Sequence, residues 1–226
     1  MKGTLEICCT SLEDAQHAFD NGADRIELCE DLSVGGVTPS LELIDLVISK
    51  VKIPVFVLIR PRSGNFVFNN EELQKMLSSI QESKDAGAGG IVSGALSSDN
   101  LIDIHALDDL IEASSPLPFT FHRAFDESQN IEHAFNQLRS IGVKRVLSSA
   151  GLSRASHNPD KVSKFVQLSK SNPRVLCCGG IRSSNIQDLL HIPELWEFHS
   201  PALSSSLAVD PNEVRLMRDY IDIAFK

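Results

Sequence analysis

The feature that most constrains the fold of this chain is an alternation of strand-like and helix-like segments that repeats eight times in 226 residues. Each strand-like segment is a short apolar run, and apolar residues recur at helical spacing in the segment after it. "TLEICCT" with "SLEDAQHAFDNGA" is the first such unit, and "LWEFHSPAL" with "PNEVRLMRDYIDIAF" is the last. Eight strand–helix units predict a parallel sheet closed into an α/β fold, a (β/α)8 TIM barrel that occupies residues 1–226 as a single domain. An open doubly wound sheet is the weaker alternative, because no G-x-G-x-x-G turn follows the first strand.

Composition argues against several classes of protein. A net charge of −9 argues against a nucleic-acid partner, since proteins that bind the phosphate backbone concentrate Lys and Arg. No apolar run approaches the ~18 residues of a membrane span, and the first ten residues lack the apolar stretch of a signal peptide. Five cysteines, an odd number with two adjacent pairs, do not indicate a disulfide framework. We therefore expect a cytoplasmic protein with no nucleic-acid or membrane partner.

Polar side chains are expected to gather at one end of the barrel. Active sites of this fold lie at the carboxyl ends of the strands, and strand alternation decides which side chains point inward. The strand that ends in "IRPR" adds Arg60 and Arg62 at the mouth. Burying so many ionisable groups unpaired costs roughly several kcal/mol each, so the set indicates a ligand site. The residues that alternation turns inward are Glu6, Cys8, Glu27, Cys29, Thr120, His122, Glu197 and His199.

Structural explanations for single residues stay open. Interior ion pairs between Glu27 and Arg60, or between Glu6 and Arg62, would satisfy these groups without any ligand. His122 alone would also suit a hydrogen-bonded core position. These alternatives explain individual residues better than they explain the whole set.

The stretch "FTFHRAFDES" ends a predicted strand with three groups suited to chemistry. We expect His122 to point into the mouth, within reach of Glu27, His199 or a pocket water. Alternation sends Arg123 the other way unless the strand has already ended, so Arg123 is expected to pair with Asp126 and brace the loop.

The loop "CCGGIRS" after the seventh strand offers a second kind of contact. Barrels often hold phosphate at the loops after strands seven and eight, through backbone N–H groups. Gly179 and Gly180, with Ile181, could serve in that way. A tight turn that needs glycine is the alternative explanation.

These residues predict an enzyme or sensor for a small anionic metabolite, a class that includes phosphorylated compounds. Arg60, Arg62 and Arg123 would hold a phosphate or carboxylate, because guanidinium groups match the geometry of both. Glu27 and His122 would form an acid–base pair. The groups proposed to orient that pair are Asp126 and Glu6.

Several stretches resemble the motifs of the CutC family of copper homeostasis proteins: "LEICCTSLEDA", "GADRIELCEDLSVGGVTPS", "IPVFVLIRPRSGNFVFNNEE", "LPFTFHRAFDES" and "EFHS". The resemblance runs in order from about Leu5 to His199. It implies a cytoplasmic (β/α)8 barrel, often a homodimer, with a role in copper homeostasis. The cysteines proposed to hold Cu(I) in the family match Cys8 and Cys29. The family's other site residues match Arg60, Arg62, His122, Arg123, Asp126 and His199.

Copper binding is thus the function that the resemblance predicts, because soft sulfur ligands select Cu(I), and the enzyme or sensor for a small anion is the alternative. Neighbouring strands lie ~4.8 Å apart, so Cys8 and Cys29 could share an ion if their sulfurs come within ~4.5 Å. Inward residues of adjacent barrel strands belong to different layers, which would instead separate the two sulfurs. The chain departs from the family pattern at "LCCGGI" after the seventh strand and in the shortened "SPALSSSLAVD" after the eighth.

Overall fold

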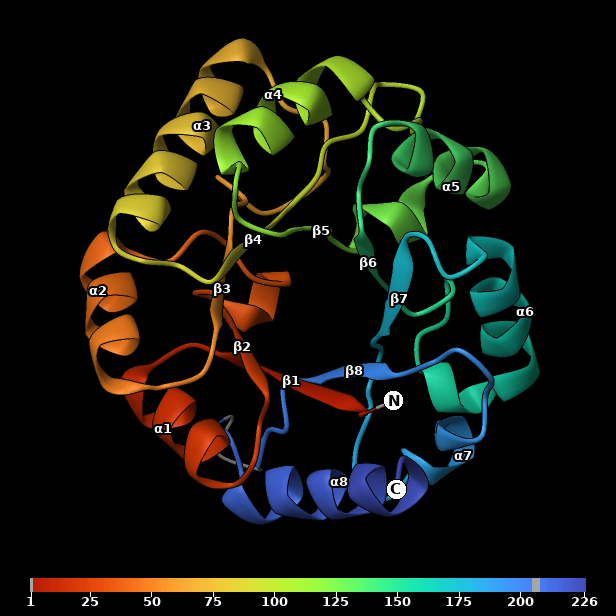
Figure 1. Cartoon of the computed structure of the whole chain (residues 1–226). Helices are drawn as coiled ribbons and strands as arrows, with labels where there is room; N and C mark the ends of the chain where they lie inside the picture. Colours follow the sequence, from red (N-terminus) through yellow and green to blue (C-terminus); the bar gives the residue numbers. More distant parts are fainter. Residues whose placement is uncertain (1, 205–207) are drawn as a thin grey trace.

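Eight parallel strands close into a barrel whose strand order follows the order of the chain. The computed structural model describes residues 2–204 and 208–226, so part of the shortened segment after the eighth strand lies outside the described residues. Closure comes from pairing of the first strand with the last, with Glu6 opposite His199. The helices surround the barrel (Figure 1). The predicted closed (β/α)8 barrel is confirmed.

The elements alternate as the sequence predicts. The strands are β1 (Thr4–Cys9), β2 (Arg25–Leu28), β3 (Val55–Leu58), β4 (Gly90–Ser93), β5 (Phe119–Phe121), β6 (Arg145–Ser148), β7 (Arg174–Cys177) and β8 (Glu197–Ser200). The α-helices are α1 (Leu12–Asp20), α2 (Leu41–Lys50), α3 (Asn70–Asp85), α4 (Ile104–Ser114), α5 (Ile131–Ser140), α6 (Pro159–Ser169), α7 (Gln187–Leu190) and α8 (Pro211–Ala224). Three short 3-10 helices lie in the loops: η1 (Leu32–Val34), η2 (Arg123–Glu127) and η3 (Ala155–His157). No helix of the described residues combines the length and apolarity needed to cross a membrane.

Local capping explains where several helices begin. The Ser11 hydroxyl accepts the Asp14 N–H at the start of α1, which satisfies one backbone donor of the first turn. Asp210 caps α8, and Pro211 occupies the first helical position, where its missing N–H costs no hydrogen bond. Each cap supplies an acceptor to a backbone N–H group that the first helical turn leaves without an internal partner.

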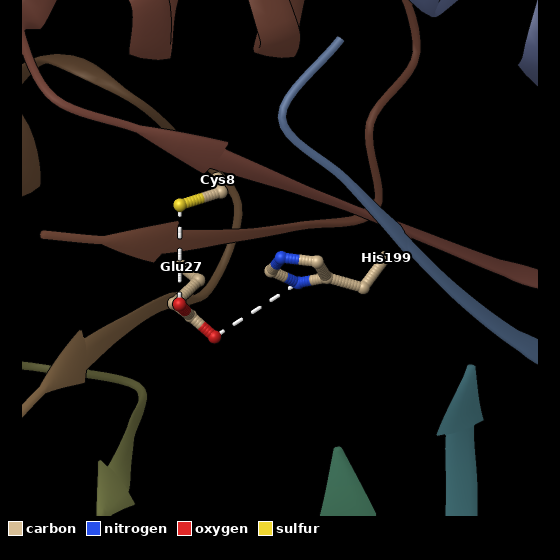
Figure 2. Close-up of side chains that lie close together, drawn as sticks. All are labelled: Cys8, Glu27 and His199. Atoms are coloured by element: carbon tan, nitrogen blue, oxygen red, sulfur yellow. Dashed lines mark hydrogen bonds and ion pairs between the residues drawn. The ribbon is translucent and has the colours of Figure 1, made fainter. Parts of the chain in front are cut away.

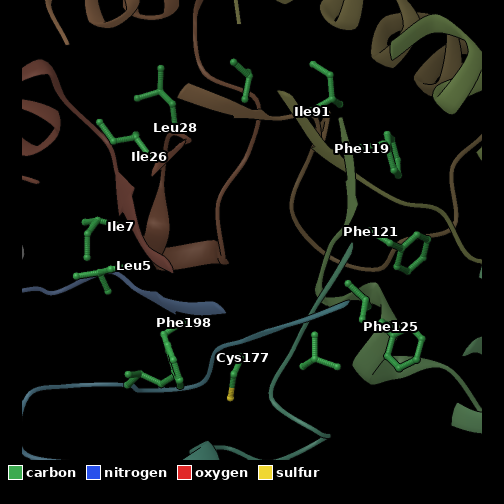
Figure 3. Close-up of a cluster of buried hydrophobic side chains, with 14 of the residues drawn as sticks. Leu5, Ile7, Ile26, Leu28, Ile91, Phe119, Phe121, Phe125, Cys177 and Phe198 are labelled. Carbon is green, nitrogen blue, oxygen red and sulfur yellow. The ribbon is translucent and has the colours of Figure 1, made fainter. Parts of the chain in front are cut away.

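The apolar core lies mainly between the strands and the helices (Figure 3). The outward side chains Leu5, Ile7, Ile26 and Leu28 are all fully buried there. A separate cluster that includes Cys8 and Cys29 lies inside the barrel. The two clusters confirm the predicted alternation, because consecutive strand residues enter opposite sides of the sheet.

An ion-pair network fills the barrel at the amino ends of the strands. Arg25 donates both to Glu6 and, over 3.0 Å, to Glu197. Arg145 donates to the same Glu197 carboxylate over 2.6 Å. The Phe56 ring lies against both guanidinium groups, with its centroid 4.9 Å from Arg25 Cζ and 5.5 Å from Arg145 Cζ. We call these five residues the charged plug. Glu6 is fully buried within it, so this end of the barrel is filled by side chains.

Candidate functional site

A cavity of about 210 Å³ opens at the carboxyl ends of the strands. Its walls come from opposite sides of the barrel and from the loops after β2, β3, β5 and β7. The predicted site residues that line it are Cys8, Glu27, Arg60, His122, Arg123, Gly179, Gly180 and His199. Leu58, Phe66 and Leu147 are among the apolar residues that complete it.

Four predicted site residues lie outside the lining of this cavity. Glu6 belongs to the charged plug and also contacts His199 of the cavity lining, so a part for Glu6 in orienting the acid–base pair stays a prediction. Arg62 donates to Glu72 and to the carbonyl of Val67, and thereby braces the loop after β3. Asp126 is enclosed by the loop after β6. Cys29 is fully buried behind Cys8.

The two alternative ion pairs considered from the sequence do not form. Arg25, which alternation also places inward, takes the carboxylate of Glu6. Glu72 on α3 takes the guanidinium of Arg62. Arg60 is held by backbone carbonyls and forms no ion pair with a described residue.

Cys8 lies at the centre of a group of potential donor atoms. Its sulfur is 3.4 Å from Cys29 Sγ and 3.9 Å from Glu27 Oε1. Figure 2 shows the Glu27 carboxylate joined to both Cys8 and His199, with Oε2 at 3.9 Å from His199 Nδ1. One donor atom each from Cys8, Glu27 and His199 lie within 4.8 Å of one another. The two sulfurs therefore meet the spacing required for a shared ion, and the layer offset that would have separated them does not occur.

The buried carboxylates have very different proton affinities. Burial raises the pKa of Glu27 to about 7, and the neighbouring Glu6 carboxylate acts in the same direction. Although burial also opposes ionisation of Glu6, Arg25 and His199 hold the pKa of Glu6 at about 2. His199 Nδ1 lies 2.7 Å from Glu6 Oε1. Burial opposes charge on this histidine, but Glu27 and Glu6 raise the pKa of His199 above its usual value.

His122 lines the cavity, as the sequence predicts, but neither of its ring nitrogens forms a hydrogen bond with Glu27 or His199. Its Nδ1 accepts the Ala124 N–H over 3.4 Å, and its ring lies 4.7 Å from the Phe66 ring. Burial, reinforced by the charge of Arg60, lowers the pKa of His122 to about 3. The imidazole is therefore neutral at physiological pH, with its proton on Nε2. A part for His122 in acid–base chemistry stays a prediction.

Arg123 and Asp126 form the loop brace expected from the sequence. Arg123 Nε donates to Asp126 over 3.2 Å, and η2 begins directly after β5 ends. The carboxylate also accepts from the Ser149 N–H and hydroxyl and from the Gly151 N–H. Because β5 ends at Phe121, strand alternation no longer directs the Arg123 side chain away from the barrel interior. Arg123 therefore also lines the cavity.

Close packing requires glycine in the loop after β7. Gly179 has a φ of +93°, and a Cβ there would lie 2.7 Å from the Ser149 Cβ. Gly180 has a φ of +66° and lies beside Arg154. The backbone of this loop can thus form part of the cavity wall directly.

A model of the CutC family matches residues 3–204, which include all eight strands. This chain belongs to the CutC family. A human copper homeostasis protein cutC homolog is 40% identical to the chain over 201 residues, which cover 89% of the chain and 74% of the human protein. A family protein CutC of Histophilus somni (strain 2336) is 38% identical over 198 residues, 88% of the chain and 82% of that protein. The chain is thus a homologue of copper homeostasis proteins.

Solved structures agree with this CutC assignment. A CutC structure from Streptococcus agalactiae superposes with a TM-score of 0.82 and 30% identity, over 88% of this chain and 98% of that one. Phosphoribosylanthranilate isomerase from Thermotoga maritima superposes with a TM-score of 0.65 at 12% identity, over 98% and 99% of the two chains. The second similarity shows the barrel fold alone.

Sequence analysis of this CutC chain missed several residues that shape the site. Arg25 and Arg145 begin their strands, where a charged residue resembles part of the preceding turn. Phe66 lies in a loop but packs on His122 and on the Arg60 guanidinium, whose Cζ is 4.8 Å from its ring centroid. Alternation counted backwards from Glu27 could have found Arg25. No local pattern identifies Phe66.

Proposed function

We propose that this chain binds Cu(I) as its cargo in cytoplasmic copper homeostasis, with Cys8 and Cys29 as the ligands. The observation that carries the proposal is the distance of 3.4 Å between the two sulfurs inside the barrel. Thiolates are soft ligands and favour Cu(I) over the harder divalent ions. The names of the human and bacterial relatives support the same function.

The surroundings of the sulfur pair suit a metal that enters from the cavity. Cys8 lines the cavity, whereas Cys29 is fully buried behind it. A Cβ at Gly36 would lie 3.4 Å from Cys29 Sγ, so this loop covers the second sulfur. We therefore expect Cu(I) to meet Cys8 first. His199 is the nearby nitrogen donor that could complete the site.

Copper binding requires deprotonated thiols. The hydrogen bond with Cys29, together with burial, raises the pKa of the Cys8 thiol well above its usual value. Metal binding must therefore release a proton from Cys8, and affinity should fall as the pH is lowered. All five cysteines are free, which suits a protein of the reducing cytoplasm.

The test is anaerobic titration with Cu(I) against a chromophoric Cu(I) chelator. Wild-type protein should bind Cu(I) stoichiometrically, and a Cys8→Ser/Cys29→Ser double variant should lose on the order of 100-fold or more in affinity. Cys177→Ser is the matched control, because Cys177 is buried in the core outside the barrel. Undiminished binding by a folded double variant would exclude the pair.

A further inference from the structure

Arg60 is a buried cation without a counter-anion at the edge of the cavity. Only 6% of the residue is exposed. Its Nη1 donates to the carbonyls of Val34 and Gly36, and its Nη2 to that of Gly64, over 2.7 to 3.0 Å. No ion pair joins Arg60 to a carboxylate of the described residues, although Glu127 is close enough to favour its charge. Burial of a charge with only dipolar partners is costly, so this position favours a ligand that supplies negative charge.

A second buried donor lies beside it. Because His122 Nδ1 accepts the Ala124 N–H, the neutral ring carries its proton on Nε2. That nitrogen is buried and has no partner in the described part of the chain, and the same is true of Arg60 Nε. The Phe66 ring packs against both residues. Two unpartnered N–H groups of neighbouring side chains are a recurrent means of receiving an oxyanion.

Other parts of the cavity wall add polar groups that lack hydrogen-bond partners among the described residues. The N–H groups of Gly179 and Gly180 have no acceptor among residues 2–204 and 208–226. Across the cavity, Glu27 Oε2 is buried and makes no hydrogen bond with any residue that the structure describes. The lining thus offers donors to an anionic group and an acceptor to a hydroxyl group.

We propose that this cavity binds a small hydroxylated organic anion, with its carboxylate or phosphate beside Arg60 and His122 and a hydroxyl directed to Glu27. The cavity volume of about 210 Å³ suits a small metabolite. This site is separate in chemistry from the proposed sulfur ligands of Cu(I), because it uses nitrogen donors of residues that follow β3 and β5.

Calorimetric titration of the metal-free, reduced protein tests this inference. The probes are glycolate, glycerol 3-phosphate and neutral glycerol, in the presence of a Cu(I) chelator. Saturable binding of either anion, without binding of glycerol, is the expected result. The preferred probe then identifies the anionic group as carboxylate or phosphate.

Two variants locate the site. Arg60→Gln removes the charge, and His122→Asn keeps an acceptor near the Ala124 N–H while it removes the Nε2 donor. Each should weaken anion binding on the order of tenfold or more, as loss of a hydrogen bond to a charged group does. Arg62→Gln is the matched control, because Arg62 binds Glu72 away from the cavity. If Arg60→Gln does not fold, His122→Asn alone decides.

The inference is overturned if neither anion binds with a Kd below about 10 mM. It is equally overturned if glycerol binds as well as the anions, or if Arg62→Gln weakens binding as much as His122→Asn. Because copper is absent throughout, failure of the copper proposal would leave these results unaffected.

Discussion

At the scale of single residues, His122 is held neutral inside a folded protein. Its folded pKa of about 3 lies below the usual 6.5, so the unfolded chain binds more protons between these values. The contribution of the neutral His122 imidazole to the free energy of unfolding is complete above pH 6.5. It is lost as the pH falls towards 3, by about 1.4 kcal/mol per pH unit. Relative to His122→Asn, the wild type should therefore lose stability in this window when both are unfolded in urea. Parallel stability curves would show that His122 does not titrate in this way.

Glu27 should show the opposite dependence. Its pKa of about 7 exceeds the usual 4.5, so the folded state binds more protons between these values. The wild type should lose stability as the pH rises from 4.5 to 7, by about 3 kcal/mol in all. Glu27→Gln keeps the shape of the side chain without the charge. The free energy of unfolding of Glu27→Gln, relative to that of the wild type, should thus rise across this range. The same difference between the two proteins at pH 5 and at pH 8 would contradict the expectation.

At the scale of elements, the carboxylate of Asp126 joins η2 to the loop after β6. It accepts hydrogen bonds from Ser148, Ser149 and Gly151 and pairs with Arg123. Asp126→Asn should destabilise the fold by about 2–4 kcal/mol, because an amide nitrogen would face several donors. Asp108→Asn, on the exposed side of α4, is the control and should change stability little. Equal urea midpoints for the two variants would rule out the brace.

The elements also show what could be predicted from the sequence. Strand alternation placed Cys8, Glu27, His122 and His199 correctly, because the pleat alone determines the face. Alternation could not show that the Nη groups of Arg60 would donate hydrogen bonds to three loop carbonyls. Partners such as Arg25 and Glu197 lie 172 residues apart, and only closure of the barrel brings them together.

At the scale of the whole molecule, the charged plug contributes to stability through residues of five strands. Glu197 accepts from both Arg25 and Arg145. Glu197→Gln would leave two guanidinium groups without their shared carboxylate, and should cost about 3–5 kcal/mol. Glu112→Gln, exposed on α4, is the control for chemical denaturation. A loss of less than 1 kcal/mol, which is about a factor of five in the unfolding equilibrium constant, would mean that the network relaxes around the neutral side chain.

The homodimer implied by the family resemblance remains a prediction at the same scale. Light scattering of the purified protein should then give twice the chain mass of 24.7 kDa. A mass of one chain at micromolar concentration would contradict it.

The charged plug also has a kinetic consequence. A barrel filled at one end exchanges its contents through the other end only. If an organic anion beside Arg60 lies across that route, an ion bound at Cys8 would leave only after the anion has departed. Release of the metal would then be timed by the dwell time of the small molecule rather than by the strength of the metal–sulfur bonds.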